Sequence, residues 1–332
     1  MKAIALLSGG LDSTLAARVL LEQGIELEAL NFITVFCNCT HRDESCLASQ
    51  KAVATLGIPL KVMNVSEEYL DVVKHPEHGY GSNMNPCIDC RIFMLKKAKA
   101  YMEERGASFI VTGEVLGQRP MSQRKEAMAL IERKAGLEGL ILRPLSAHLL
   151  RMTIPEREGW VDRKKLLAIQ GRSRKPQMKL AEAFGIRDYP CPAGGCLLTD
   201  PQFAKRMKDL LIHQADFGLN DVHLLKVGRH FRLSPQVKLV VGRNEEENQR
   251  IKTFAREDDG LLKVVHYPGP LTLMRGEAEE DLVEVAAALT ARYSKAKDLE
   301  RVEISFSRNG QDRSLWVAPL PEAKLREWMI SD

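Results

Sequence analysis

Residues Leu6 to Leu20 read LLSGGLDSTLAARVL, an apolar stretch that runs into two glycines and then into a segment with helical spacing. Such a turn directs backbone N–H groups and a helix N-terminus at one spot, which favours a phosphate-like anion. Glycine lets the anion approach the backbone closely, Ser8 and Ser13 add hydroxyl donors, and Asp12 is a candidate magnesium ligand. No Gly-Lys-Ser/Thr follows, so the stretch is not a Walker-type loop.

Apolar segments of strand length alternate with amphipathic segments of helix length over the first 150 residues. This alternation predicts an α/β domain with a parallel sheet and right-handed crossovers. The expected strands are 2–7, 26–36, 59–65, 108–113 and 139–144, and the expected helices are 13–24, 46–58 and 91–106. Ligands of such sheets bind beyond the carboxyl ends of the strands, so we expect the loops that follow these strands to form one cleft.

The motif SGGLDS resembles the pyrophosphate-binding loop of the ATP pyrophosphatases, the PP-loop family of adenylating enzymes. The resemblance covers residues 1–150 and implies a parallel-sheet domain of the adenine-nucleotide α-hydrolase kind that binds ATP and Mg²⁺. The ATP-binding residues it implies in the loop are Ser8, Gly9, Gly10, Asp12 and Ser13.

Two further segments resemble the tRNA-thiolating branch of that family. NPCIDCRIFMLKKA is similar to a segment of the tRNA 2-thiouridylases and puts Cys90 at the place of their catalytic cysteine, although Arg91 stands where they have asparagine. VTGEVLGQRPMSQ and LILRPL look like strand ends of the tRNA 4-thiouridine synthetases. That likeness implies a nucleotide and base cleft lined by Thr112, Gly113, Gln118 and Ser122.

The chemistry of this family implies that a base carbonyl is adenylated, pyrophosphate leaves, and sulfur then displaces AMP. A thiolate with a lowered pKa is a good nucleophile. We expect Arg91 and Lys96 to lower the pKa of Cys90, which would carry or accept sulfur from a donor such as a cysteine desulfurase or sulfide.

Cysteine spacing leaves the state of the sulfur site open. Cys87 and Cys90 form a CxxC pair, and Cys191 or Cys196 in YPCPAGGC supplies a distant partner. This set resembles the [4Fe-4S] sites of cluster-dependent tRNA thiolases, and it also suits tetrahedral zinc or cysteines without a functional role. A second group in CNCTHRDESC fits no known metal motif and is either functional or a reactive loop; it comprises Cys37, Cys39, His41 and Cys46.

Basic residues crowd the segment that follows the first domain. From residue 151 to 187 there are ten Lys and Arg against four Asp and Glu, although the whole chain carries only +4. We interpret 151–235 as a basic, cysteine-containing extension in which Arg172, Arg174 and Lys175 contact RNA phosphates. A solvated linker helix is the alternative.

Residues 236–332 are expected to form a small α+β module. The stretches KLVVGRNEEENQRI, HYPGP and ARYSKAKDLERVEISF resemble the RNA-binding module of factors that act on nascent chains of stalled ribosomes. That module usually carries a tryptophan where DDGLLKVVHYPGP has leucine. The resemblance implies RNA contacts by Arg243, Asn244, Asn248 and His266, and the alternative is a module that only packs or dimerises.

The sequence thus predicts an ATP-dependent tRNA sulfurtransferase. The rivals are a PP-loop enzyme that acts on a small molecule, and an RNA-binding protein without catalysis. The apolar start MKAIALL is too short for a signal or a membrane-spanning helix, and seven cysteines are an odd number, so a cytoplasmic protein with free thiols is expected.

Overall fold

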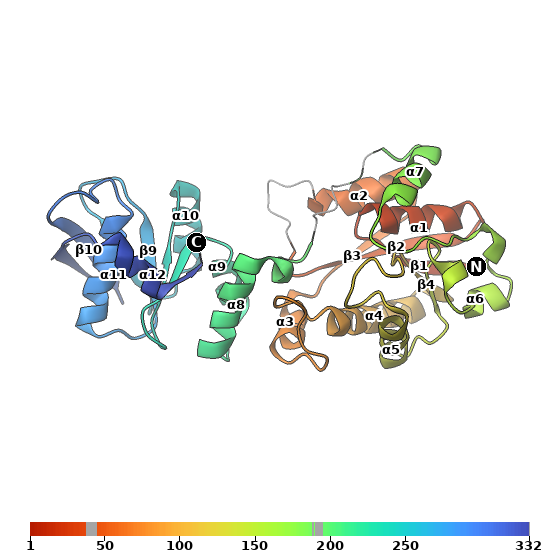
Figure 1. The fold of residues 1–332 in the computed structure, drawn as a ribbon, viewed down its shortest axis with the longest axis horizontal. Coiled ribbons are helices and arrows are strands. Elements are labelled where there is room, and N and C mark those ends of the chain that lie inside the picture. Colours follow the sequence, from red (N-terminus) through yellow and green to blue (C-terminus); the bar gives the residue numbers. More distant parts are fainter. Residues whose placement is uncertain (38–44, 188, 190–194, 332) are drawn as a thin grey trace. The chain divides into compact units, whose positions relative to one another are not determined.

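The computed structural model describes every residue except 38–44, 188, 190–194 and 332, and leaves out the side chains of 45–47 (Figure 1). Two compact units divide the chain, Met1–Leu197 and Leu198–Asp332. The middle segment expected at 151–235 is therefore shared between them. Among the described residues, no helix is both long enough and apolar enough to cross a membrane.

The first unit contains a five-stranded sheet in the order β3-β2-β1-β4-β5, and every pair is parallel. This confirms the parallel α/β domain. The strands are β1 (Lys2–Leu6), β2 (Glu26–Ile33), β3 (Leu60–Asn64), β4 (Phe109–Thr112) and β5 (Ile141–Leu142). The chain crosses from β3 back to β4 beside β1, so the order of the strands reverses at β1, where ligands of such sheets bind.

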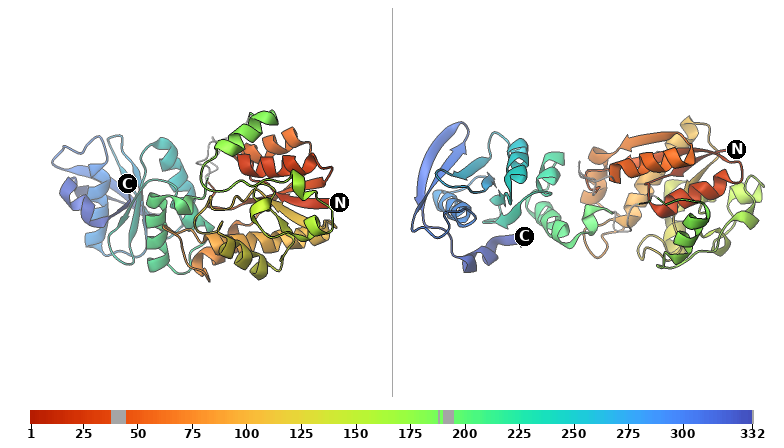
Figure 2. Two further views of the ribbon diagram at one scale, coloured as in Figure 1. Left: turned by 45° about the vertical axis from the view of Figure 1, so that its right-hand side comes forward. Right: turned by 90° about the horizontal axis from the view of Figure 1, so that it is seen from above.

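Helices cover both faces of this sheet. They are α1 (Leu11–Leu21), α2 (Ser45–Leu56), α3 (Ser66–Lys74), α4 (Cys87–Glu104), α5 (Lys125–Ala135), α6 (Ile154–Arg157) and α7 (Lys175–Ala183). Side chains of β1 alternate between two cores, because successive residues of a strand point to opposite faces. Ala3 and Ala5 pack with α1, α2 and α7, whereas Ile4 packs with α4 and α5. The ribbon shows these two groups of helices on opposite sides of the sheet (Figure 1 and Figure 2).

The second unit is built on an antiparallel sheet in the order β11-β10-β8-β9-β7-β6-β12. Its strands are β6 (Arg229–Arg232), β7 (Lys238–Val241), β8 (Gly260–Val264), β9 (Leu271–Arg275), β10 (Val302–Arg308), β11 (Gln311–Val317) and β12 (Met329–Ser331). Its helices are α8 (Pro201–His213), α9 (Leu219–Leu224), α10 (Glu245–Phe254), α11 (Glu280–Arg292) and α12 (Glu322–Trp328). The small α+β module expected at the C-terminus is thus confirmed.

Candidate active site

The glycine turn after β1 is shaped by close packing as well as by backbone conformation. Gly9 has φ +79°, and a Cβ added there would lie 2.3 Å from the carbonyl carbon of Ala48 in α2. Ser13 Oγ donates to the carbonyl oxygen of Gly10 at 2.9 Å and ties the turn to the start of α1. The first N–H groups of α1 lack intrahelical acceptors, as in every helix, and can bind an anion here.

The loop after β4 packs directly on the first turn of α1. A Cβ on Gly113 would lie 2.4 Å from the backbone nitrogen of Ser13, so only glycine permits this approach. Gln118 Nε2 donates to Asp12 Oδ2 at 3.0 Å, and the other carboxylate oxygen, Asp12 Oδ1, is buried and has no protein partner among the described residues. The structure therefore brings together the predicted residues of the first and fourth strand ends.

The unpaired oxygen of Asp12 suits a cation. A buried carboxylate oxygen without a partner is unfavourable, whereas Mg²⁺ prefers oxygen ligands and is usually bound by one or two carboxylates together with phosphates. The donor set at this turn therefore fits the magnesium ion of an ATP complex.

A buried ion-pair network lies beside the loop that follows β4. Glu114 is 2% exposed and accepts from Arg143 Nε at 2.9 Å, while Arg91 Nε lies 3.4 Å from its other oxygen. Burial disfavours the charged carboxyl, but Arg143 and Arg91 outweigh burial and hold the pKa of Glu114 below its ordinary value. Thr112, predicted to line the cleft, donates to Glu114 at 3.3 Å and is itself buried.

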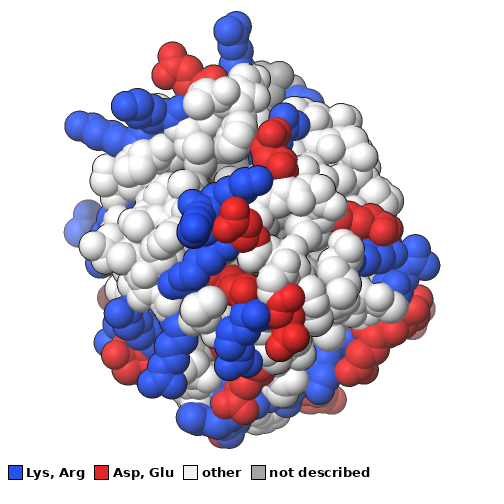
Figure 3. Space-filling model, turned by 90° about the vertical axis from the view of Figure 1, so that its right-hand side faces the viewer, with Lys and Arg blue, Asp and Glu red and all other residues white. Residues whose placement is uncertain are grey.

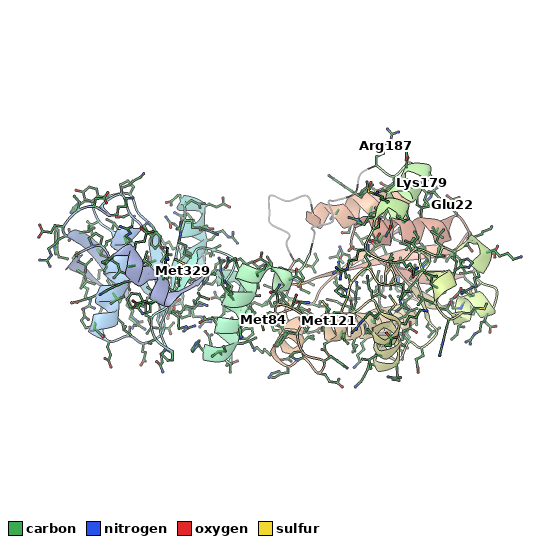
Figure 4. All side chains as sticks on the ribbon, in the orientation of Figure 1. Glu22, Met84, Met121, Lys179, Arg187 and Met329 are labelled. Carbon is green, nitrogen blue, oxygen red and sulfur yellow. The ribbon has the colours of Figure 1, made fainter. Side chains whose placement is uncertain are left out.

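Removing this carboxylate should destabilise the first unit. Glu114→Ala leaves buried Arg143 with one fewer partner, and breaking a buried pair in this way costs about 3–5 kcal/mol. Glu22→Ala is the matched control, because Glu22 pairs with Arg18 at the surface (Figure 4) and its loss should cost less than about 1 kcal/mol. Calorimetry of the full chain should show a large shift in the melting of the first unit for Glu114→Ala only. Equal shifts for the two variants would contradict the structural role of Glu114.

The cysteines gather around one buried tyrosine. Tyr69 of α3 is 2% exposed, and its hydroxyl forms a hydrogen bond with Cys90 and lies within electrostatic range of Cys87 and Cys196. Burial and these sulfurs raise the pKa of Tyr69, so the phenol stays protonated and donates to the sulfur. Cys196 thus acts on the same hydroxyl as the two cysteines of the CxxC pair.

Cys37 lies beside this group, which the sequence did not predict. The backbones of Cys37 and Cys196 form an antiparallel bridge, with the N–H of Leu197 donating to the carbonyl of Phe36 at 2.8 Å. The Cys37 sulfur accepts a hydrogen bond from the backbone N–H of Thr34 at 3.3 Å. Cys39, His41 and Cys191 lie outside the described residues, as does the side chain of Cys46.

The expected lowering of the thiol pKa is wrong for Cys90. Burial raises the pKa of this thiol, and the hydrogen bond from Tyr69 and the charge of Arg91 do not overcome it. Lys96 is exposed further along α4. In the protein as it stands, Cys90 is therefore a protonated thiol near neutral pH, and a proton acceptor or a bound electrophile is needed to activate it.

The described thiols are not arranged for one small ion. Ligand atoms around zinc lie close together, because Zn–S bonds are about 2.3 Å long. Among the described residues, the only group of three or more metal-ligating atoms within 4.8 Å of one another is Glu77, His78 and Asp89. This geometry gives no support to zinc at the cysteines.

Two sets of predicted RNA-binding residues differ in their surroundings. Arg172 and Lys175 are exposed just before and at the start of α7, and Lys179 within this helix and Arg187 beyond its end are exposed as well (Figure 4). Elsewhere in the basic segment Arg163 pairs with Glu156, and cationic and acidic side chains are interspersed on the face shown in Figure 3. Arg174 is half-buried.

The predicted residues near α10 have structural partners. Asn244 caps this helix by accepting from the N–H of Glu247 at 2.9 Å, and Arg243 donates to the Glu247 carboxylate at 2.6 Å. Asn248 accepts from the N–H of Leu271 at 2.9 Å. His266 is mostly exposed and lies 3.1 Å from Glu303.

Comparison with known proteins matches each end of the chain to a protein family. Residues 1–148 match the family described as thiamine biosynthesis protein (ThiI), and residues 228–329 match the NFACT protein RNA binding domain. The tRNA-specific 2-thiouridylase MnmA of Pseudomonas fluorescens (strain SBW25) is 30% identical over 242 residues, which cover 68% of this chain and 60% of that protein. The chain spans about a third to three fifths of the length of the curated relatives it matches.

Two solved structures match the chain with TM-scores below 0.5. A 4-thiouridine synthetase in complex with RNA and ATP covers 68% of this chain and 52% of its own, with 21% identity and a TM-score of 0.37. The U34-tRNA thiolase NcsA of Methanococcus maripaludis, with its [4Fe-4S] cluster, covers 59% and 61%, with 18% identity and a TM-score of 0.33. The two family models and the curated relative show that the chain joins a ThiI-like PP-loop domain, related to the tRNA thiouridylases, to a C-terminal RNA-binding domain of the NFACT type.

Proposed function

We propose that this chain is an ATP-dependent tRNA sulfurtransferase. One observation carries the proposal, namely that a continuous path of contacts links the glycine turn to the cysteines. Gly113 packs on the first turn of α1, the next residue, Glu114, contacts Arg91, and Arg91 follows Cys90. The relationship to tRNA thiouridylases and the C-terminal RNA-binding domain point to tRNA as the substrate.

In the first step the carbonyl oxygen of an RNA base forms a bond to the α-phosphorus of ATP, and the bond to pyrophosphate breaks. The backbone N–H groups around Gly9 and Gly10 and the N-terminus of α1 hold the pyrophosphate, which carries away the electron pair of the broken bond. Asp12 holds the Mg²⁺ that offsets its charge.

In the second step the terminal sulfur of a persulfide on Cys90 attacks the adenylated carbon, and AMP leaves. Cys87 or Cys196 then attacks the Cys90 sulfur, which frees the thiolated base and leaves a disulfide between the two cysteines. A thiol reductant reopens this disulfide, and a donor such as a cysteine desulfurase supplies the next sulfur. The Tyr69 hydroxyl orients the Cys90 sulfur by donating to it.

An alternative form of the same site holds a [4Fe-4S] cluster on Cys87, Cys90 and Cys196. The three partly buried cysteines that act electrostatically on Tyr69 supply the number of thiolate ligands that such a cluster needs from the protein when one iron stays open. When bound with three cysteines, the cluster supplies an iron with an open position that can hold sulfide. Metal analysis after anaerobic purification distinguishes the two forms, since stoichiometric iron indicates the cluster and its absence indicates the persulfide.

Pyrophosphate release by the purified chain tests the proposed function. With ATP and Mg²⁺, release should require tRNA, because the base carbonyl is the nucleophile of the first step. Release that needs a small molecule and ignores tRNA would favour a PP-loop enzyme of that kind. A chain that binds tRNA but never releases pyrophosphate would favour a non-catalytic RNA-binding protein.

Charge reversal at the start of α7 should weaken RNA binding. Arg172 and Arg174 are proposed to contact phosphates, and each lost contact reduces both affinity and its dependence on salt. The double variant with Arg172→Glu and Arg174→Glu should bind tRNA at least about tenfold more weakly at low salt and bind ATP unchanged. Filter binding over a series of salt concentrations measures both effects. Unchanged tRNA affinity would rule out this contact.

A further inference from the structure

Exposed apolar side chains concentrate at one end of the sheet in the second unit. Of the nine large apolar side chains that are exposed in the described part of the chain, four lie at or beside this place. They are Trp316 at 55% exposure, Tyr267 at 45%, Val265 at 43% and Leu299 at 43%. Such clusters usually mark an interaction site, whereas single exposed apolar residues need no explanation.

Three of them, Trp316, Tyr267 and Leu299, line a small pocket of about 190 Å³. It is formed where β8 ends and β10 begins, and where β11 runs alongside. We call it the Trp316 pocket, and its lining includes His266, Tyr267, Leu299, Arg301, Glu303 and Trp316. Arg301 donates to the carbonyl oxygen of Trp316 at 2.9 Å, which holds a guanidinium beside the indole.

The outer face of the sheet is open at this end. Trp316 and Glu303 are opposite one another on β11 and β10, so their side chains point to the same face. The alternate residues of β10, such as Ile304, are buried with α11 on the other face. On the outer side α9 and α10 pack instead over β7 and β9, which leaves Trp316 accessible.

Three cationic side chains near the pocket can contact phosphates. Lys295, Lys297 and Arg301 are exposed, and none has a carboxylate within 4.0 Å among the residues that the structure describes. The backbone N–H of Lys295 donates to Pro268, so this basic segment lies against the loop that carries Tyr267. Asp298, Glu300 and the pocket-lining Glu303 match these three cations in number, so we expect stacking to supply most of the affinity.

We propose that the Trp316 pocket binds unpaired bases of RNA, which stack on Trp316 and Tyr267 while nearby cations contact phosphates. Aromatic side chains beside arginine form the usual platform for single-stranded nucleic acid, because every base has a π-face. Duplex RNA keeps its bases stacked inside the helix and cannot use such a platform. The pocket lies within residues 228–329, which match an RNA-binding domain but are not thereby assigned a contact surface.

Binding of a labelled single-stranded oligoribonucleotide to the full chain tests this proposal. Trp316→Ala should weaken binding by about fivefold or more, since a stacked base contributes about 1–3 kcal/mol. Trp316→Phe keeps an aromatic ring and should retain most of the affinity, and Tyr267→Ala should weaken binding independently. Ile212→Ala, at an exposed apolar residue of α8, is the control and should bind as the unaltered chain does.

The outcomes distinguish RNA from a protein as the occupant of the pocket, and they do not depend on the proposed catalysis. A duplex of the same length should bind equally to all these variants. Oligonucleotide affinity that is unchanged in Trp316→Ala and Tyr267→Ala would overturn the proposal, and it would do so even if the same variants lost a contact with a protein. Because no ATP is present, the result is independent of whether the first unit transfers sulfur.

Discussion

Cys90→Ala is expected to abolish thiolation and to leave ATP binding intact. Cys90 carries the reacting sulfur in the proposed mechanism, and alanine offers neither a nucleophile nor a ligand. Its sulfur is buried and tied to Tyr69, whereas the residues that hold ATP lie on the glycine turn and the loop after β4. Product formation should therefore fall below detection, and equilibrium binding of ATP should change by less than about twofold, as expected for a site not in contact with the changed atom.

Cys37→Ala is the matched control for this experiment. Cys37 lies beside Cys196 through the backbone, but its sulfur accepts from the N–H of Thr34 and is not needed in the proposed transfer. This variant should therefore keep most of the thiolation activity. If Cys90→Ala retained activity and Cys37→Ala lost it, Cys37 in the loop after β2 would carry the sulfur. The proposed role of the CxxC pair would then be wrong.

Asp12→Asn is expected to slow pyrophosphate release by about 10²- to 10³-fold. The asparagine side chain has nearly the same shape but no charge, so the turn should fold normally while Mg²⁺ loses its carboxylate ligand. The buried Oδ1 atom is the reason to expect so large an effect, because it has no hydrogen-bond partner among the described residues. The rate at saturating ATP should be measured over a range of Mg²⁺ concentrations, and the half-saturating concentration should rise.

Gln118→Ala provides the comparison for Asp12→Asn. Gln118 contacts Asp12 through Oδ2, so its loss frees the carboxylate to rotate without removing the charge. We expect a decrease of about tenfold or less, as for the loss of a positioning hydrogen bond worth about 1 kcal/mol. Pyrophosphate release by Asp12→Asn at the unaltered rate would show that the carboxylate does not hold the metal.

The sequence predicted the first sheet well because its strands are buried on both faces. A continuous apolar run such as KAIALL is typical of a buried strand when strand-length and helix-length segments alternate along the chain. Glycines at positions 9 and 113 lie where two backbones approach each other closely. Helices α3 and α5 were not predicted, since their segments are rich in charged residues.

Properties that depend on burial escaped prediction. Arg91 next to Cys90 indicated a lowered thiol pKa, but the sequence does not show that α3 covers the sulfur and that burial outweighs the charge. Tyr69 gave no signal at all, because its role arises only when α3 packs beside α4. Glu114 did give a signal in the sequence, because its carboxylate directly follows a buried strand and a glycine.

The sequence indicated a structural role for Asn244, but we interpreted this residue as an RNA contact. Asn244 is followed three residues later by Glu247, which is the spacing of a helix N-cap with an acidic third residue. The structure shows this cap, and Arg243 pairs with the same glutamate. Their contact with RNA stays a prediction, and the Trp316 pocket offers a surface in which aromatic side chains are not committed to the fold.

Nucleoside mass spectrometry of total tRNA tests the central claim most directly. The tRNA is taken from cells with and without the gene, and from cells in which the gene is restored as the unaltered chain or as Cys90→Ala. We predict that one thionucleoside disappears without the gene and returns only with the unaltered chain. If every thionucleoside persists at its normal level in the absence of the gene, or if Cys90→Ala restores the missing one, this chain does not transfer sulfur to tRNA through Cys90.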